Sequence, residues 1–267
     1  MKILAPSLLA AALLAPSLTQ AHDMWLLPSS TVLSGDQAVI TVDAAVGNDK
    51  FYFNHHPLSL NNLEITSPSG KRVQAENKFS GKLRSGFDLP LTEDGTYRIA
   101  IATPGGLFAR WKEGGQNKRW FGNAKDYAQH VPKDAKDLVV AERSNRVETF
   151  VTKGNPTDLP AVEQGLGLAS DTHPNDLYAG EETQFTLTLD GQPAKQVDVE
   201  VVREGSRYRN ALEEIKVKTD DKGVFKIKWP QAGRYWLHAQ TSDKKTSTPL
   251  AKQRGLAYTA TLEVLPQ

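Results

Sequence analysis

Polar and apolar residues alternate without interruption in Thr183-Gln184-Phe185-Thr186-Leu187-Thr188-Leu189, and the run ends in Asp190-Gly191. Alternation with a period of two indicates a β-strand with one buried face, and Asp-Gly is typical of the turn that follows such a strand. Similar runs recur on both sides of this one, separated by turns rich in Gly, Pro and Asp. They lie at 37–43, 62–66, 96–101, 146–152, 197–201, 214–218, 224–228, 234–238 and 260–264. The pattern predicts an all-β protein built from antiparallel sheets.

A short motif divides these strands into two sets. Gly95-Thr96-Tyr97 and Gly233-Arg234-Tyr235 each place a tyrosine at the start of a late strand, which resembles the tyrosine corner of immunoglobulin-like sandwiches. We therefore predict two immunoglobulin-like antiparallel β-sandwich domains in tandem, at 22–153 and 169–267. The segment 154–168, which is rich in Gly and Pro, is predicted as their linker. An insertion near 105–140 is expected to hold one short helix that is broken at Pro132.

The first 21 residues are typical of a cleaved secretory signal peptide. Lys2 precedes an apolar stretch at 3–14 that is too short to span a bilayer, and Ala21 is a small residue suited to cleavage. No later apolar run approaches the roughly 20 residues of a transmembrane helix. The sequence thus predicts a periplasmic protein without a transmembrane segment in its mature chain. Cleavage after Ala21 would leave His22 as the first residue.

Composition and motifs exclude several classes of function. Lys and Arg total 32 against 31 for Asp and Glu, so the basic excess of a nucleic-acid-binding protein is absent. The chain has no Cys, which excludes disulfides, Cys-based metal sites and Cys nucleophiles. The motifs of α/β-hydrolases, nucleotide-binding loops and zinc metalloproteases are also absent. We therefore favour a non-catalytic protein over an enzyme. The sequence leaves the oligomeric state open.

Several segments are similar to a bacterial family known as domain of unknown function 4198. They include His22-Asp23-Met24-Trp25-Leu26-Leu27-Pro28, Thr172-His173-Pro174-Asn175-Asp176-Leu177 and Gly233-Arg234-Tyr235-Trp236-Leu237. The resemblance extends from residue 21 to the C-terminus. It implies a secreted or periplasmic protein of Gram-negative bacteria with immunoglobulin-like sandwiches. Members of the family have been linked to nickel or cobalt uptake, but the family supplies no established reaction.

An N-terminal histidine is a candidate metal ligand. Its free amine and its ring nitrogen can chelate one ion, and a further imidazole completes a three-nitrogen set that suits Cu(II) or Ni(II). His55, His56 and His173 are the candidates for that imidazole. Because adjacent residues on a strand point to opposite faces, we favour His56, which Pro57 restrains, over His55. The alternative is that all of these histidines are incidental residues of turns.

A second candidate site interleaves cations with aromatic rings at 108–112 and 118–121. Trp111, Arg119 and Trp120 are its proposed ligand platform, which would suit a glycan or an anionic partner through ring stacking and cation–π contacts. The alternative, which we favour, is a β-hairpin with one apolar face packed on the core.

These features lead to three hypotheses about function. The first is a periplasmic accessory protein that binds copper or nickel through His22 for delivery or uptake, with an envelope metal transporter as its partner. The second is a non-catalytic immunoglobulin-like module that binds a glycan or an envelope protein. The third is a histidine-brace copper oxidase.

Overall fold

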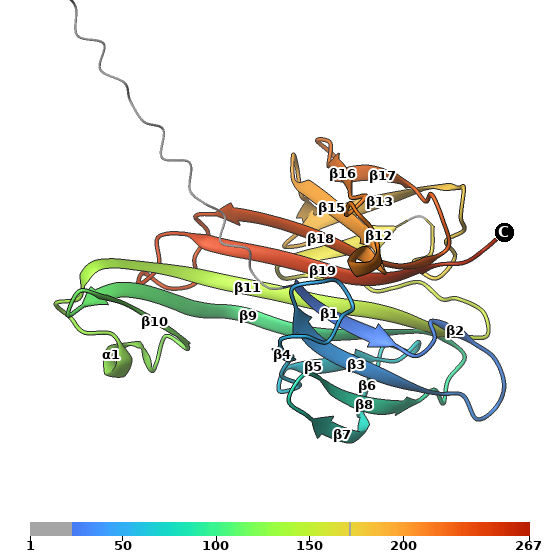
Figure 1. Ribbon diagram of the computed structural model, residues 1–267, viewed down its shortest axis with the longest axis horizontal. Helices are drawn as coiled ribbons and strands as arrows, with labels where there is room; N and C mark the ends of the chain where they lie inside the picture. The colour runs from blue at the N-terminus through green and yellow to red at the C-terminus, as the bar shows by residue number, and fades with distance from the viewer. Residues whose placement is uncertain (1–22, 171) are drawn as a thin grey trace, which may run out of the picture.

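The computed structural model describes residues 23–170 and 172–267 as three β-sheets (Figure 1). Most strand pairs are antiparallel, and the described helices are α1 (Tyr127–His130) and the 3₁₀ turn η1 (Ser206–Tyr208). The prediction of an all-β, immunoglobulin-like fold is thereby confirmed. Within the described residues, no helix is both long and apolar enough to cross a bilayer.

A five-stranded sheet belongs to the N-terminal half. Its order is β1-β3-β8-β7, and β4 pairs with β3 beyond the end of β8. Its strands are β1 (Asp23–Pro28), β3 (Val39–Gly47), β4 (His56–Pro57), β7 (Glu76–Ser80) and β8 (Ser85–Pro90). A four-stranded sheet belongs to the C-terminal half, and it consists of β12 (Leu166–Ser170), β13 (Glu182–Leu189), β14 (Gln192–Pro193) and β17 (Val224–Lys228).

A ten-stranded sheet runs through both halves. Its order is β16-β15-β18-β19-β11-β9-β5-β6, with β10 paired to β9 and β2 paired to β11. The two halves meet where β19 pairs in parallel with β11, which puts Glu142 opposite Arg254 and Thr149 opposite Thr261. The strands are β2 (Val32–Leu33), β5 (Leu63–Thr66), β6 (Arg72–Val73), β9 (Gly95–Glu113), β10 (Gln116–Gly122), β11 (Lys136–Lys153), β15 (Asp198–Arg203), β16 (Ile215–Lys218), β18 (Gly233–Asp243) and β19 (Arg254–Val264).

Strand β11 contributes to two hydrophobic cores. Val147 and Val151 pack with the five-stranded sheet, whereas Phe150 packs with the four-stranded sheet. Because successive side chains on a strand point to opposite faces, the two cores lie on opposite faces of the shared sheet at β11. Each half is therefore a sandwich whose second layer is part of the same sheet. The division of the chain at 154–168 stays a prediction, and β12 begins inside that segment.

Both predicted tyrosine corners are present. The Tyr97 hydroxyl accepts a hydrogen bond from the Glu93 N–H at 2.7 Å, and the Tyr235 hydroxyl donates to the Gln231 carbonyl at 2.7 Å. Both tyrosines are buried, and each bonds the backbone four residues upstream. The bonds fix the chain where it enters β9 and β18.

We expect Tyr97→Phe and Tyr235→Phe each to lower the free energy of unfolding by about 1–2 kcal/mol. Tyr97→Phe removes the hydrogen bonds of the hydroxyl with the Glu93 N–H and the Glu93 carbonyl, and Tyr235→Phe removes the one with the Gln231 carbonyl. Each change leaves a partly buried backbone group without that partner, while the ring still fills its place in the core. Urea unfolding at neutral pH measures the loss. Tyr208→Phe, on an exposed side chain, is the matched control and should change stability very little. Equal values for the three variants would contradict a structural role for the corners.

Candidate functional site

The N-terminal histidine proposed as a metal ligand, His22, lies outside the described residues. Its neighbour Asp23 begins β1 and forms an ion pair with Lys50, with 2.9 Å between the carboxylate and the ammonium. The Lys50 ammonium also lies 4.7 Å from the centre of the Trp236 ring, and the Trp236 indole N–H donates to the Met24 carbonyl at 3.0 Å. The start of β1 is therefore attached to strand β18 of the C-terminal half.

His56 lies two strands across the sheet from the start of β1, with β3 between them. Val46 of β3 pairs with Met24 of β1 on one side and with His56 of β4 on the other. Two strand spacings separate Met24 from His56, which is about 10 Å. Of the predicted ligands in the described residues, His55 and His56 are thus the ones brought near residue 23.

The loop before these histidines is held by polar and aromatic contacts. Asn54 accepts a hydrogen bond from the Asn48 N–H and donates one to the Asp49 carboxylate, both at 3.1 Å. Phe51 and Phe53 contact the buried ring of Trp25, with 5.9 and 6.1 Å between ring centres. The loop 48–54 is therefore packed down on β1, and it delivers His55 and His56 to a defined place on the surface.

The ring of His56 has one nitrogen engaged by the backbone. Nδ1 lies 2.9 Å from the Pro57 carbonyl, and because a carbonyl only accepts, Nδ1 carries the proton. In the neutral ring the lone pair is then on Nε2. Metal-binding histidines commonly show this arrangement, in which the non-ligating ring N–H donates to a carbonyl. The exposed rings of His55 and His56 are 4.7 Å apart.

His173 is placed elsewhere, with both ring nitrogens bonded. Nδ1 accepts the Asn175 N–H at 3.1 Å, so Nε2 donates to the Thr96 hydroxyl at 2.9 Å. Burial lowers the pKa of His173 from its usual value. Asn175 in turn donates to the Thr31 carbonyl at 3.1 Å. Thr31 follows the end of β1 that is opposite to residue 23, and β1 is about 17 Å long. The structure does not bring His173 to residue 23.

The two remaining histidines contact aromatic rings. His130 stacks on Trp120 with 5.7 Å between centres, and His238 of β18 stacks on Trp236 at 5.0 Å. Burial and then the Lys50 charge lower the pKa of His238 to about 4. Across the described ranges 23–170 and 172–267, no three His, Asp or Glu side chains are grouped as metal ligands.

The proposed aromatic platform is divided between two faces of a hairpin. Strand β10 pairs with β9 so that Trp120 lies opposite Ala109 and Arg119 lies opposite Arg110. Trp111 is buried and packs with Trp120 and Val131 in a small hydrophobic cluster beside α1. Arg119 is exposed on the opposite face. The indole rings thus belong to a packed face of the hairpin, in a small cluster of its own beside α1.

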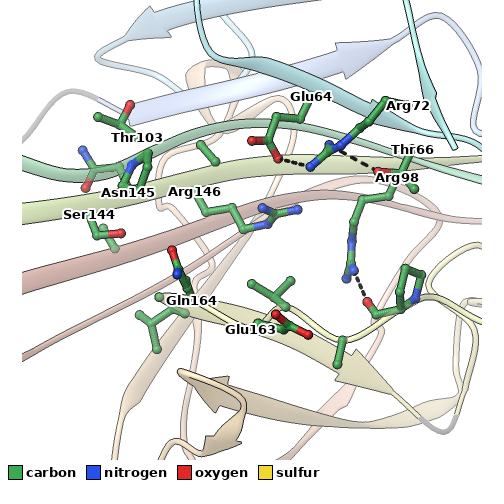
Figure 2. Close-up of a pocket in the computed structure, with 18 residues that line it drawn as sticks. Glu64, Thr66, Arg72, Arg98, Thr103, Ser144, Asn145, Arg146, Glu163 and Gln164 are labelled. Atoms are coloured by element: carbon green, nitrogen blue, oxygen red, sulfur yellow. Dashed lines mark hydrogen bonds and ion pairs between the residues drawn. The ribbon is translucent and has the colours of Figure 1, made fainter. Parts of the chain in front are cut away.

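A cavity of about 350 Å³ lies between the two halves (Figure 2). Strands β5, β9 and β11 form one wall and residues 160–166 form the other. Arg72 of β6 bonds the carboxylate of Glu64 at 3.0 Å, and Arg98 donates to the carbonyls of Pro160 and, at 3.2 Å, Leu168. The cavity wall therefore joins the N-terminal strands to the segment that leads into the C-terminal half.

A buried carboxylate, Glu148, lies behind this wall. Its Oε2 is 2.6 Å from Nε of Arg146 and 3.2 Å from Nε of Arg98, and its Oε1 accepts the Tyr258 hydroxyl at 2.5 Å. The nearby arginines hold the pKa of Glu148 below its usual value despite complete burial. These residues come from β9, β11 and β19, so the network connects the strands where the two halves meet.

Sequence reasoning missed this network, although a signal for it exists. Arg146 and Glu148 stand on the same face of a strand whose other residues include Val147, Phe150 and Val151. Two charged residues of opposite sign at alternate positions in a buried strand indicate a paired interior charge, because an unpaired one is too costly. Arg98 interrupts the apolar strand 96–101 in the same way.

Comparisons with known proteins identify the family. The family model for "Domain of unknown function (DUF4198)" matches residues 19–243. No curated protein matches the chain. Among solved structures, the D0-D1 domain of intimin is 14% identical over 90% of this chain and 97% of its own, with a TM-score of 0.24. A DUF3823 family protein from Bacteroides uniformis is 12% identical over 92% and 100%, with a TM-score of 0.25.

A third solved structure, the FN1–FN3 domains of chicken CNTN1, is 8% identical over 90% of this chain and 97% of its own, with a TM-score of 0.24. Structural likeness at these scores supports no inference about function. The match of the family model covers most of the chain, and it agrees with the resemblance seen in the sequence. The chain therefore belongs to the family described as Domain of unknown function (DUF4198).

Proposed function

We propose that the protein binds one copper(II) or nickel(II) ion through His22 and His56. The observation that supports the proposal is the register of β1, β3 and β4, which puts Met24 and His56 on either side of Val46. Residues two apart on a strand share a face, and so do residues directly opposite each other. In this proposal the ion lies beside the start of β1, on the face that Met24 and His56 share.

The chemistry of the two histidines suits such an ion. When the signal peptide is removed after Ala21, His22 offers its α-amine and one ring nitrogen as a chelate. His56 offers Nε2, because its Nδ1–H is bonded to the Pro57 carbonyl. Three neutral nitrogen donors favour Cu(II) or Ni(II) over hard cations such as Mg²⁺. His55, whose ring contacts that of His56, is a second candidate for the third ligand.

The proposed role is that of a metal-binding accessory protein in the periplasm, which delivers the ion to an envelope transporter or receives it from one. The signal-like N-terminus and the exposed position of His55 and His56 support this role. An exposed site is accessible to a partner protein for transfer. A copper oxidase that uses the same ligands would in addition consume oxygen when a reductant is supplied.

Titration of the mature protein with Cu(II) and then Ni(II) tests the proposal. The protein is secreted into a bacterial periplasm, and intact mass establishes that it begins at His22. We expect tight one-to-one binding. One additional N-terminal alanine should abolish this binding, because it converts the chelating amine into an amide. His56→Ala should weaken binding by at least about 10–100-fold, the loss that even an outer-shell partner causes.

Two histidine controls make the result specific. His130→Ala removes an exposed imidazole from the distant hairpin, and His173→Gln changes a histidine whose nitrogens are both bonded. Neither should alter the metal affinity. Equal binding by the mature protein and its alanine-extended form would show that the α-amine of His22 is not a ligand. If His55→Ala, but not His56→Ala, lowers the affinity, the third ligand is His55.

A further inference from the structure

The outer parts of β9 and β11 extend as an arm beyond the strands that join the two halves (Figure 1, green, at the left). β19 pairs with β11 only from Glu142 onward, so the part of β11 before Glu142 pairs with β9 alone. β10 adds a third strand on the other side of β9. The arm is thus a small three-stranded sheet that carries α1 and the loops around it.

The two faces of this arm differ in composition. One face carries Ala109, Trp111, Trp120 and Val140, which pack with Val131 and Tyr127 from the segment around α1. The other face has two rows of side chains that run across β10, β9 and β11. One row is Arg119, Arg110 and Val139, and the next is Phe121, Phe108 and Ala141. We name this second face the arginine–phenylalanine face, and it comprises Phe108, Arg110, Arg119, Phe121, Val139 and Arg143.

Large apolar side chains on the arginine–phenylalanine face are exposed. Phe121 is 53% exposed and Val139 is 44% exposed. Arg143 lies over the ring of Phe108, with 4.6 Å between the guanidinium carbon and the ring centre. Large apolar side chains rimmed by charged ones on an uncovered face are typical of interaction surfaces.

The charge of this face is positive and uncompensated. None of Arg110, Arg119 and Arg143 forms an ion pair with any of the described residues. Asp137, at the tip of the arm, is held by Lys112 at 3.0 Å. From 105 to 143 the chain has eight Lys and Arg against five Asp and Glu, although the whole chain has a net charge of only +1. The positive charge is therefore concentrated on the arm.

We propose that the arginine–phenylalanine face binds the surface of an anionic phospholipid bilayer. Guanidinium groups match phosphate geometry with two parallel hydrogen bonds, and they are weakly hydrated. Exposed Phe and Val side chains enter the boundary between headgroups and acyl chains, where amphipathic surfaces anchor. A sheet face that presents rings and guanidiniums in adjacent rows suits a broad, planar, negatively charged surface.

Sedimentation with lipid vesicles tests this proposal. We expect the protein to bind vesicles of phosphatidylglycerol and phosphatidylcholine in equal parts, and not vesicles of phosphatidylcholine alone. The variant Arg110→Gln, Arg119→Gln, Arg143→Gln should lose about 100-fold in partition coefficient, because each basic residue near an anionic surface contributes about one factor of five. Phe121→Ser should weaken binding by roughly tenfold, since it removes an apolar anchor without a change of charge.

A matched variant separates surface recognition from net charge. Lys118→Gln, Lys125→Gln, Lys133→Gln removes the same number of charges from the same arm, but none of the three residues belongs to the arginine–phenylalanine face. At about 0.1 M salt, charges farther than about 10 Å from the membrane are screened, so this variant should lose less than about tenfold. Circular dichroism establishes that each variant is folded.

Three outcomes would overturn the proposal. The first is no binding of the unmodified protein to the anionic vesicles. The second is an equal loss in the two triple variants, which would mean that charge alone is responsible. The third is binding to heparin or to oligo(dT) together with no binding to the vesicles, which would assign the face to a polyanionic chain instead of a lipid surface.

Discussion

Glu148→Ala is expected to lower the free energy of unfolding by about 3–5 kcal/mol. The carboxylate is fully buried, and it accepts contacts from Arg98, Arg146 and Tyr258 at 3.2, 2.6 and 2.5 Å. Removing one partner of a buried ion pair leaves the other charge without compensation in a poorly solvated place. Here two guanidinium groups lose their shared partner at once, and Tyr258 loses its hydrogen-bond acceptor.

Urea unfolding at neutral pH measures this loss, and a surface pair supplies its control. Lys226 and Glu182 form an ion pair at 3.1 Å in which both side chains are more than half exposed. Glu182→Ala should change stability by less than about 1 kcal/mol, because water screens and solvates exposed charges. A loss of that small size in Glu148→Ala would show that water reaches the carboxylate or that the arginines find other partners.

The position of Glu148 explains why its effect is expected to be large. It lies on β11 next to Phe150, between the strands that each half contributes to the shared sheet, and Arg98 also bonds the carbonyls of Pro160 and Leu168. The network therefore holds β9, β11, β19 and the connection to β12 in one arrangement. A break in it affects both sandwiches.

Local sequence patterns predicted the strands but not the way the halves join. Each predicted run lies largely within an observed strand, because alternation of apolar residues is a property of adjacent positions. The parallel pairing of β11 with β19 joins Glu142 to Arg254, which are more than a hundred positions apart, and no local pattern encodes it. The end of the short helix was also predictable, since α1 ends at His130, before Pro132, and proline cannot continue a helix.

For the candidate metal site, the sequence could predict which way neighbouring side chains point along a strand, but not which strands pair. The rule that adjacent strand residues face opposite ways predicted that one of His55 and His56 faces a shared site, and the restraint by Pro57 favoured His56. The structure adds that His56 is two strands from Met24. The position of His173 could not be predicted from the sequence. Its partner Thr96 is far away in the chain, and its contact with the Asn175 N–H depends on the turn that follows it.

The alternation of side chains along a strand also explains how the aromatic platform is divided in the β9–β10 hairpin. Trp111, Arg119 and Trp120 were grouped because they are interleaved in the sequence. Arg119 and Trp120 are adjacent on β10, so their side chains lie on opposite faces. Applied strictly, alternation would have separated the packed tryptophans from the exposed arginines at the outset.

The stability of the protein is expected to fall by about 2–3 kcal/mol between about pH 7 and about pH 4.5 through His238 alone. Burial, followed by the charge of Lys50, lowers the pKa of His238 from 6.5 to about 4. In this range the unfolded state binds a proton that the folded state does not, so acid favours unfolding. The stability that the neutral His238 ring contributes is fully present above pH 6.5, and it is lost as the pH falls toward 4.

Urea unfolding at a series of pH values isolates this effect when His238→Gln is compared with the unmodified protein. The variant should show a smaller loss of stability in acid. The comparison with the variant is needed because other groups near His238 also titrate. Glu200 lies opposite His238 on β15, and burial raises the pKa of Glu200. The effect of Glu200 is that stability falls as the pH rises, which opposes the effect of His238. His173, whose pKa burial also lowers, acts in the same direction as His238 but is present in both proteins.

His130→Gln is the control for the loss of an imidazole, because His130 is exposed on the arm. Its pH profile should match that of the unmodified protein. If His238→Gln gives that same profile too, the His238 ring takes up its proton in the folded state. The stack of His238 on Trp236, at 5.0 Å, must then accommodate a charged imidazole beside Lys50. Because Trp236 also holds the Met24 carbonyl, protonation of His238 in the folded state would act on the segment that carries the proposed metal ligands.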